Sequence, residues 1–240
     1  MLRSCVLAAG VLAACGAANA AIITQWDFNG QSATTVPGGG TSPTPSIGAG
    51  TASLLASVTG SFSSGIANGG SSDPVTTSPP NFGWQTTTYP AQGAGSGTAG
   101  VRFDISTVGV LGPDLYAYFD VRHSNTSSRF VQVQYTTDGT TFTNAPGGLF
   151  EATAGGDTWY KLRQVNLGAD PLVFNNANFG FRVVTVFDPG TPGSYSAAST
   201  TYAGTGTLRF DMVTLDTQPI PEPASAALLA AGAMLSRRRR

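Results

Sequence analysis

Apolar and polar positions alternate along the central part of the chain. Within 101–105, Val101, Phe103 and Ile105 alternate with Arg102 and Asp104, and the same period of two runs through 115–123 and 130–137. Because successive side chains of a strand point to opposite faces, this period predicts β-strands. One face of each strand is apolar and the other polar, which indicates a sheet with one buried and one wet face.

The remaining strands are less regular. We expect them at 22–28, 52–58, 158–167, 179–187 and 207–215. Asp138-Gly139 separates two β-branched stretches, which predicts a hairpin turn. Segments 34–50, 65–80 and 190–206 are rich in Gly, Ser, Thr and Pro and are expected to be loops.

Eight or nine strands without intervening helices predict an all-β fold for the body, residues 21–218. The expected architecture is a two-sheet antiparallel β-sandwich of the jelly-roll type. An N-terminal signal helix and a short C-terminal hydrophobic helix are expected to flank it.

Charge and cysteine content argue against several classes of function for this body. Charged residues make up 10% of the 240, against roughly 25% in typical soluble domains. Without both terminal segments, seven basic and twelve acidic side chains remain, a net charge of −5. That balance argues against nucleic-acid binding, which needs clustered cations. Cys5 and Cys15 both precede the body, so thiol catalysis, disulfides and thiolate metal sites are not expected in it.

The first twenty residues have the pattern of a signal peptide. Arg3 is followed by an apolar stretch that ends in Ala18-Asn19-Ala20, and small residues at these two alanine positions suit signal peptidase. We expect cleavage after Ala20. Lipidation at Cys15, which follows a lipobox-like Leu-Ala-Ala, is the alternative.

The last 22 residues, 219–240, resemble a weak membrane anchor. The uncharged stretch 224–236 has thirteen residues and would span about 20 Å as a helix, short of a hydrocarbon core of about 30 Å. The basic cluster follows at Arg237, Arg238, Arg239 and Arg240. Because clustered arginines favour the cytoplasmic side, the body is expected outside, with a transient membrane association through the helix.

Pro221-Glu222-Pro223, the apolar stretch and the terminal arginines together resemble the PEP-CTERM sorting signal of exported bacterial proteins. The resemblance implies recognition by an exosortase, removal of the tail near Pro221, Glu222 and Pro223, and delivery to the cell surface or extracellular matrix. The apolar stretch is shorter than in many such signals. The body resembles a group of PEP-CTERM proteins that open with Gln-Trp-Asp-Phe-Asn, here residues 25–29, and whose activity is not established. Strand 208–215 is similar to the last strand of carbohydrate-binding jelly-rolls.

The body offers little for acid–base catalysis, since it contains one histidine, His123, and one glutamate, Glu151. His123 shares its parity with the apolar face of 115–123, which predicts a buried, hydrogen-bonded histidine. A Ser-His-Asp triad is left open because triads are assembled in space, but no Gly-x-Ser-x-Gly elbow is present. We assign no catalytic residue and predict a protein that is not an enzyme.

The aspartates are scattered singly, without an Asp-x-Asp-x-Asp loop. We assign no metal ligand and no cofactor. Asp27 and Asp211 nevertheless fall in the expected first and last strands, where related jelly-rolls sometimes hold a structural Ca²⁺, and this site is left open.

Aromatic residues in polar loops could stack on sugar rings. Trp84 and Tyr89 are the candidate sugar platform, with Tyr195 and Tyr202 in a second loop, whereas Trp26 and Trp159 are expected in the core. The predicted function is therefore that of an exported, non-catalytic surface or matrix protein with polysaccharide as a candidate partner. A secreted hydrolase and a purely structural matrix component are the alternatives.

Overall fold

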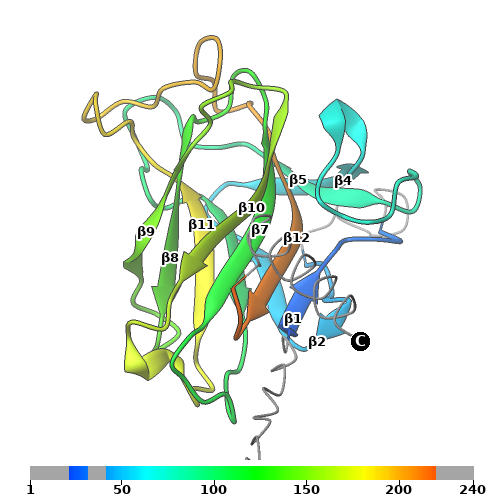
Figure 1. Cartoon of the computed structure of the whole chain (residues 1–240). Helices are drawn as coiled ribbons and strands as arrows, with labels where there is room; N and C mark the ends of the chain where they lie inside the picture. The colour runs from blue at the N-terminus through cyan, green and yellow to red at the C-terminus, as the bar shows by residue number, and fades with distance from the viewer. Residues whose placement is uncertain (1–21, 32–41, 220–240) are drawn as a thin grey trace, which may run out of the picture.

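A computed structural model of the protein describes residues 22–31 and 42–219. Within them the chain forms two antiparallel sheets that pack face to face (Figure 1). This confirms the predicted all-β, two-sheet antiparallel sandwich. The five-stranded sheet has the order β3 (Thr51–Leu54), β6 (Gly100–Asp104), β11 (Gly180–Thr185), β8 (Phe130–Thr136), β9 (Thr143–Glu151).

The seven-stranded sheet forms the second layer. Its main path is β10 (Thr158–Asn166), β7 (Tyr116–His123), β12 (Leu208–Asp216), β1 (Ile22–Trp26), β2 (Ile47–Gly48). A hairpin of β4 (Thr59–Ser64) and β5 (Phe82–Thr87) joins it through the pairing of β5 with β12, and extends this layer at one side of Figure 1. Two short 3-10 helices, η1 (Ala67–Gly69) and η2 (Pro171–Val173), lie in connections.

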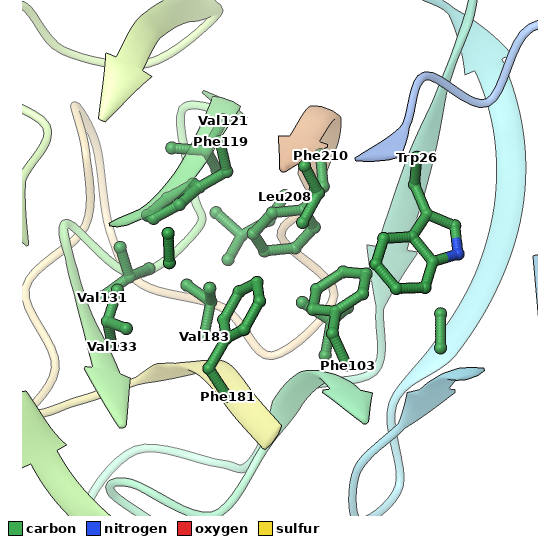
Figure 2. Packing of buried hydrophobic residues seen from close by; sticks show 14 of the residues in the cluster. Trp26, Phe103, Phe119, Val121, Val131, Val133, Phe181, Val183, Leu208 and Phe210 are labelled. Carbon is green, nitrogen blue, oxygen red and sulfur yellow. The ribbon is translucent and has the colours of Figure 1, made fainter. Parts of the chain in front are cut away.

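Alternate side chains of both sheets meet in one apolar core. Figure 2 shows Phe119 and Phe210 from the seven-stranded sheet facing Phe181 and Phe103 from the five-stranded sheet. Phe103 is central, with its ring centroid 4.9 Å from that of Trp26 and 5.2 Å from that of Phe181. The inward side chains of both sheets therefore form the core, and the alternate side chains of each strand face outward.

Most of the strands follow the predicted positions to within a few residues. The observed β6, β7, β8, β10, β11 and β12 lie within the ranges expected from the alternation, apart from one residue at an end. The expected strand 52–58 was wrong in its second half, because β3 ends at Leu54 and the chain turns before β4 begins at Thr59. Neither β4 nor β5 was predicted, because their sequences, TGSFSS and FGWQTT, contain glycine and few apolar residues.

A loop packs on the outer face of the seven-stranded sheet. Residues 65–80, here called the covering loop, connect β4 to β5. Trp159 Nε1 donates to the carbonyl of Ala67 at 2.8 Å, and Lys161 Nζ donates to that of Gly69 at 3.2 Å. Trp159 is thus buried as expected, but under the covering loop rather than between the sheets.

The predictions for the two ends of the chain lie outside the described residues. These are the signal helix with Ala18 and Ala20, the lipobox alternative at Cys15, and the C-terminal helix with its Pro-Glu-Pro and arginine elements. No helix within 22–31 and 42–219 is long and apolar enough to span a bilayer.

Candidate functional site

A row of polar side chains crosses the outer face of the five-stranded sheet. The strand register aligns one residue from each strand at the same level. The row consists of Ser53, Arg102, Arg182, Gln134 and Asn144, in the order of the strands across the sheet. We call this set the polar row. All five side chains are at least partly exposed, so the row is accessible over the full width of the sheet.

Hydrogen bonds within the polar row hold its middle residues in place. Arg182 Nε donates to Gln134 Oε1 at 2.7 Å, and Gln134 Nε2 donates to Asn144 Oδ1 at 2.7 Å. Arg182 Nη2 also makes a long bond, 3.4 Å, to the carbonyl of Gly97. The side chains are therefore ordered by their neighbours before any ligand arrives, which reduces the conformational entropy lost on binding.

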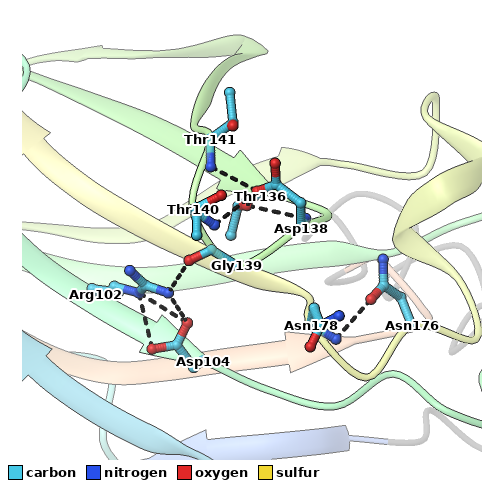
Figure 3. Close-up of polar contacts among 9 residues, drawn as sticks. All are labelled: Arg102, Asp104, Thr136, Asp138, Gly139, Thr140, Thr141, Asn176 and Asn178. Atoms are coloured by element: carbon cyan, nitrogen blue, oxygen red, sulfur yellow. Dashed lines mark hydrogen bonds and ion pairs between the residues drawn. The ribbon is translucent and has the colours of Figure 1, made fainter.

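Arg102 is held by a separate set of contacts. Its Nε lies 2.9 Å from both carboxylate oxygens of Asp104, and its Nη2 lies 2.7 Å from Asp104 Oδ1. The same Nη2 donates to the carbonyl of Gly139 at 2.7 Å (Figure 3). This bidentate pair with Asp104 compensates the charge of Arg102 within the protein.

One aromatic ring supports both guanidinium groups of the row. The Cζ of Arg182 lies 4.0 Å from the ring centroid of Phe142, and that of Arg102 lies 5.0 Å from it. Partial burial, and secondly the nearby positive charge of Arg102, lower the pKa of Arg182. Phe142 is half-buried, and it offsets part of this repulsion through its π-electrons.

The β8–β9 hairpin positions Phe142 and the carbonyl that receives Arg102. Gly139 has φ +79°, a conformation that costs glycine little, and the turn predicted at Asp138-Gly139 is confirmed. The Asp138 carboxylate accepts the backbone N–H groups of Thr140 at 2.7 Å and Thr141 at 2.6 Å (Figure 3). These bonds, that of Thr141 first, lower the pKa of Asp138.

The candidate sugar platform at Trp84 and Tyr89 was wrong, because both side chains are buried. Trp84 lies in β5 with 0% of its surface exposed, between Phe62 and Phe210 of the flanking strands. Tyr89 is 7% exposed, and its hydroxyl lies 2.6 Å from Thr86 Oγ1. Neither ring offers a free face to a sugar.

The aromatic residues of the 190–206 loop pack on each other. The rings of Tyr195 and Tyr202 stack with centroids 4.5 Å apart, and the Tyr202 hydroxyl donates to the carbonyl of Pro90 at 2.7 Å. Burial raises the pKa of both. Their contacts fasten the loop to the segment after Tyr89.

His123 is a buried histidine with a backbone partner, as predicted. It is 2% exposed, and its Nδ1 lies 2.9 Å from the carbonyl oxygen of Ser128. The ring of Tyr160 packs edge-on against it, with centroids 5.4 Å apart. Burial lowers the pKa of His123 to about 4, so the ring is neutral at physiological pH.

Carboxylates are buried beneath the covering loop. Asp211 and Asp120 lie opposite each other on β12 and β7, and both are fully buried. Asp120 accepts the backbone N–H groups of Ser72 and Leu162, and Asp211 accepts the Ser71 hydroxyl at 2.6 Å. Burial, together with the charges of Asp73 and Asp120, raises the pKa of Asp211 to about 8.

The Ca²⁺ site left open at Asp27 and Asp211 would lie in this region. Asp27 accepts the backbone N–H of Asn29, whose amide donates to Asp73 at 2.8 Å, and Asp73 in turn contacts Ser71 beside Asp211. The amide oxygens of Asn29 and Asn81 are buried without a hydrogen-bond partner. Orphaned oxygens next to carboxylates fit a hard cation such as Ca²⁺. Within the described residues, however, no three His, Cys, Asp or Glu side chains converge on one point.

The polar row contains residues that the sequence did not single out. Arg102 and Gln134 were recognised only as outward positions of alternating strands, and Arg182 and Asn144 not at all. For Arg102 and Arg182, the signal that was available is a charged side chain between apolar neighbours in a short strand.

Comparison with known proteins gives a likeness of fold only. No protein-family model matches the chain, and no curated protein matches it. The structure resembles the CBM22-1 xylan-binding domain from Paenibacillus barcinonensis Xyn10C, with TM-score 0.43 and 7% identity, over 84% of this chain and 97% of that domain. It also resembles the CBM22-1-CBM22-2 tandem domain of the same protein, with TM-score 0.45 and 10% identity, over 88% of this chain and 53% of the tandem.

A third similar structure is the Clostridium thermocellum Xyn10B CBM22-1-GH10 modules complexed with xylohexaose. The TM-score is 0.37 and the identity 15%, over 68% of this chain and 25% of that protein.

Proposed function

We propose that this protein is an exported, non-catalytic surface or matrix protein whose body binds polysaccharide through the polar row. The observation that carries the proposal is the alignment of Ser53, Arg102, Arg182, Gln134 and Asn144 across all five strands of one sheet. The buried aromatics Trp84 and Tyr89 have no part in it.

The shape of the row suits an extended ligand. Neighbouring strands lie about 4.8 Å apart, so a row over five strands extends over about 19 Å. That length accommodates a short stretch of a polysaccharide lying across the strands. The amide and guanidinium groups are planar and held by their neighbours, which suits hydrogen bonding to successive sugar hydroxyls.

The terminal segments support the location that we propose. A signal peptide would export the chain through signal peptidase, and the PEP-CTERM-like segment 219–240 would bring it to an exosortase. A polysaccharide-binding body would then be retained where extracellular polysaccharide is present. The export and sorting segments at the chain ends and the polar row are thus both consistent with a polysaccharide-binding protein outside the cell.

Binding to soluble polysaccharides tests the proposal. The purified full-length chain is titrated with xylan, a mixed-linkage glucan and polygalacturonate, by calorimetry and by affinity electrophoresis. Gln134→Ala removes the amide that links Arg182 to Asn144, and we expect it to weaken binding by about tenfold. Gln164→Ala is the matched control, because Gln164 lies in β10 of the other sheet, and it should bind as the wild type does.

Two outcomes would contradict the proposal. The first is that no polysaccharide binds while the protein self-associates, which would favour a purely structural matrix component. The second is that binding persists unchanged in both Gln134→Ala and Arg102→Ala. Melting curves of each variant establish that it is folded.

A further inference from the structure

The hydrogen bonds of the polar row run in one direction. Arg182 Nε can only donate, so Gln134 must present Oε1 to it and Nε2 to the next residue. Asn144 therefore receives this Nε2 on Oδ1, and its Nδ2 makes no hydrogen bond to the described residues. Each of these two amide oxygens thus already accepts one bond inside the row, whereas the Asn144 amide N–H groups engage none of the described residues.

The guanidinium groups add further donors. Among the described residues, no hydrogen bond engages Nη1 of Arg102 or Nη1 of Arg182. Both groups are anchored through Nε and Nη2 and lie on the Phe142 ring. Arg102, Arg182 and Asn144 therefore each keep N–H groups that no described residue engages.

The charges of the two arginines are compensated differently. Arg102 forms an ion pair with Asp104 at 2.7 Å, whereas no carboxylate of the described residues lies within 4.0 Å of Arg182. The body as a whole carries a net charge of −5. The half-buried guanidinium of Arg182 is therefore a positive charge without an ion-pair partner among the described residues, on a protein that is negatively charged overall. An anion bound there would gain a charge-assisted hydrogen bond.

We propose that the polar row selects carboxylate-bearing polysaccharides, such as those built from uronic acids, through the Arg182 guanidinium. This inference rests on the proposed function and narrows its ligand class. A carboxylate only accepts hydrogen bonds and is planar, so it matches a surface of donors and the fork of a guanidinium. A neutral hydroxyl would use the same donors without the charge.

The carboxylate preference is tested by comparing the binding of one polymer with and without its carboxylate charges. The full-length chain is titrated with polygalacturonate and with the same polymer after complete methyl esterification, in a chelator-containing buffer. We expect the acid form to bind at least about tenfold more tightly. Its affinity should fall as salt is raised, because screening weakens ionic contacts, whereas the affinity for the ester should not.

Variants assign the effect to one side chain. Arg182→Gln removes the charge, and we expect it to bring the acid and ester forms to equal affinity. Arg182→Lys keeps the charge but loses the fork, and should retain part of the preference. Arg129→Gln is the matched control, since it removes one positive charge at a residue paired with Glu151, away from the row, and should leave the preference unchanged.

The results separate this inference from the proposed function. Equal binding of both polymer forms, lost in Gln134→Ala, would overturn the carboxylate preference and leave polysaccharide binding intact. A preference that survives Arg182→Gln, or tighter binding of a sulfated galactan than of polygalacturonate, would also overturn it. Absence of binding to either form would overturn the carboxylate preference, and it would overturn the proposed function as well if xylan and the mixed-linkage glucan also failed to bind.

Discussion

Arg182 and Gln134 lie directly opposite each other on β11 and β8, and the guanidinium Nε donates to the amide oxygen at 2.7 Å. The two residues are 48 positions apart in the sequence. This contact sets the direction of the hydrogen bonds in the polar row and fixes the planes of both groups.

Removing the aromatic support of the row should weaken binding without unfolding the protein. Phe142→Ala deletes the ring beneath Arg102 and Arg182, and each cation–π contact is worth about 0.5–1 kcal/mol at an exposed site. We expect the affinity for the best polysaccharide to fall by about three- to tenfold. Phe142→Tyr keeps the ring and should bind almost normally. Loss of affinity in both variants to the same degree would contradict the role given to the ring.

Trp84 should matter for stability rather than for sugar recognition. Trp84→Ala removes a fully buried ring from the core, and such changes cost about 3–5 kcal/mol. Chemical denaturation of the purified chain should show this loss. Tyr89→Phe, which loses only the hydroxyl next to Thr86, should cost about 1 kcal/mol and leave binding unchanged. Reduced binding by folded Tyr89→Phe would argue against the buried role of this region.

The burial of His123 predicts a pH dependence of stability. Because burial lowers its pKa from the ordinary value of 6.5 to about 4 in the folded protein, folding favours the neutral ring. The contribution of the neutral His123 ring to the free energy of unfolding is fully present above pH 6.5 and is lost as pH falls from 6.5 to about 4. The change in unfolding free energy is about 3 kcal/mol. Between pH 4 and 6.5 the unfolding free energy from denaturation curves should change less with pH in His123→Gln than in the wild type. An equal change in both proteins would refute this role of His123.

The oxygen-lined region beneath the covering loop predicts a response to Ca²⁺. We expect EDTA to lower the melting temperature of the purified chain and added Ca²⁺ to restore it, because bound ligand stabilises the folded state. Asp211→Asn should abolish the difference, whereas Asp138→Asn, in the distant β8–β9 turn, should retain it. An identical melting temperature with EDTA and with Ca²⁺ would remove the Ca²⁺ site from consideration.

The C-terminal segment should determine the destination of the protein. Deleting 219–240 is expected to shift the chain from the surface or matrix fraction to the soluble exported fraction, as followed by cell fractionation. Replacing only Pro221, Glu222 and Pro223 by alanine should prevent removal of the tail and leave a larger, membrane-associated form. An unchanged distribution and size in both variants would count against exosortase sorting.

Several features of the fold followed from local pattern alone. The alternation in 101–105, 115–123 and 130–137 placed β6, β7 and β8 and their inward faces, because a strand exposes its side chains with a period of two whatever its partners are. His123 was correctly placed inside for the same reason. The strands β4 and β5 escaped detection, since Ser- and Gly-rich segments become strands only when neighbours supply the pairing and the cover.

The candidate site could not be derived in this way. Trp84 was expected in a loop, and its position in a strand between β4 and β12 follows from pairing with residues that are distant in the sequence. The covering loop similarly buries Trp159 and Asp211 on the outer face of the seven-stranded sheet, through contacts between residues 92 and 140 positions apart.

The sequence by itself determined an all-β body whose strands carry an apolar and a polar face, and two terminal segments with the pattern of export and sorting signals. These properties depend on composition and on periods of a few residues. Only the tertiary structure decided which outward residues lie together, because the register between strands depends on hydrogen bonds between segments far apart in the chain. A shift of one residue in β11 would have turned Arg182 into the core and removed the polar row.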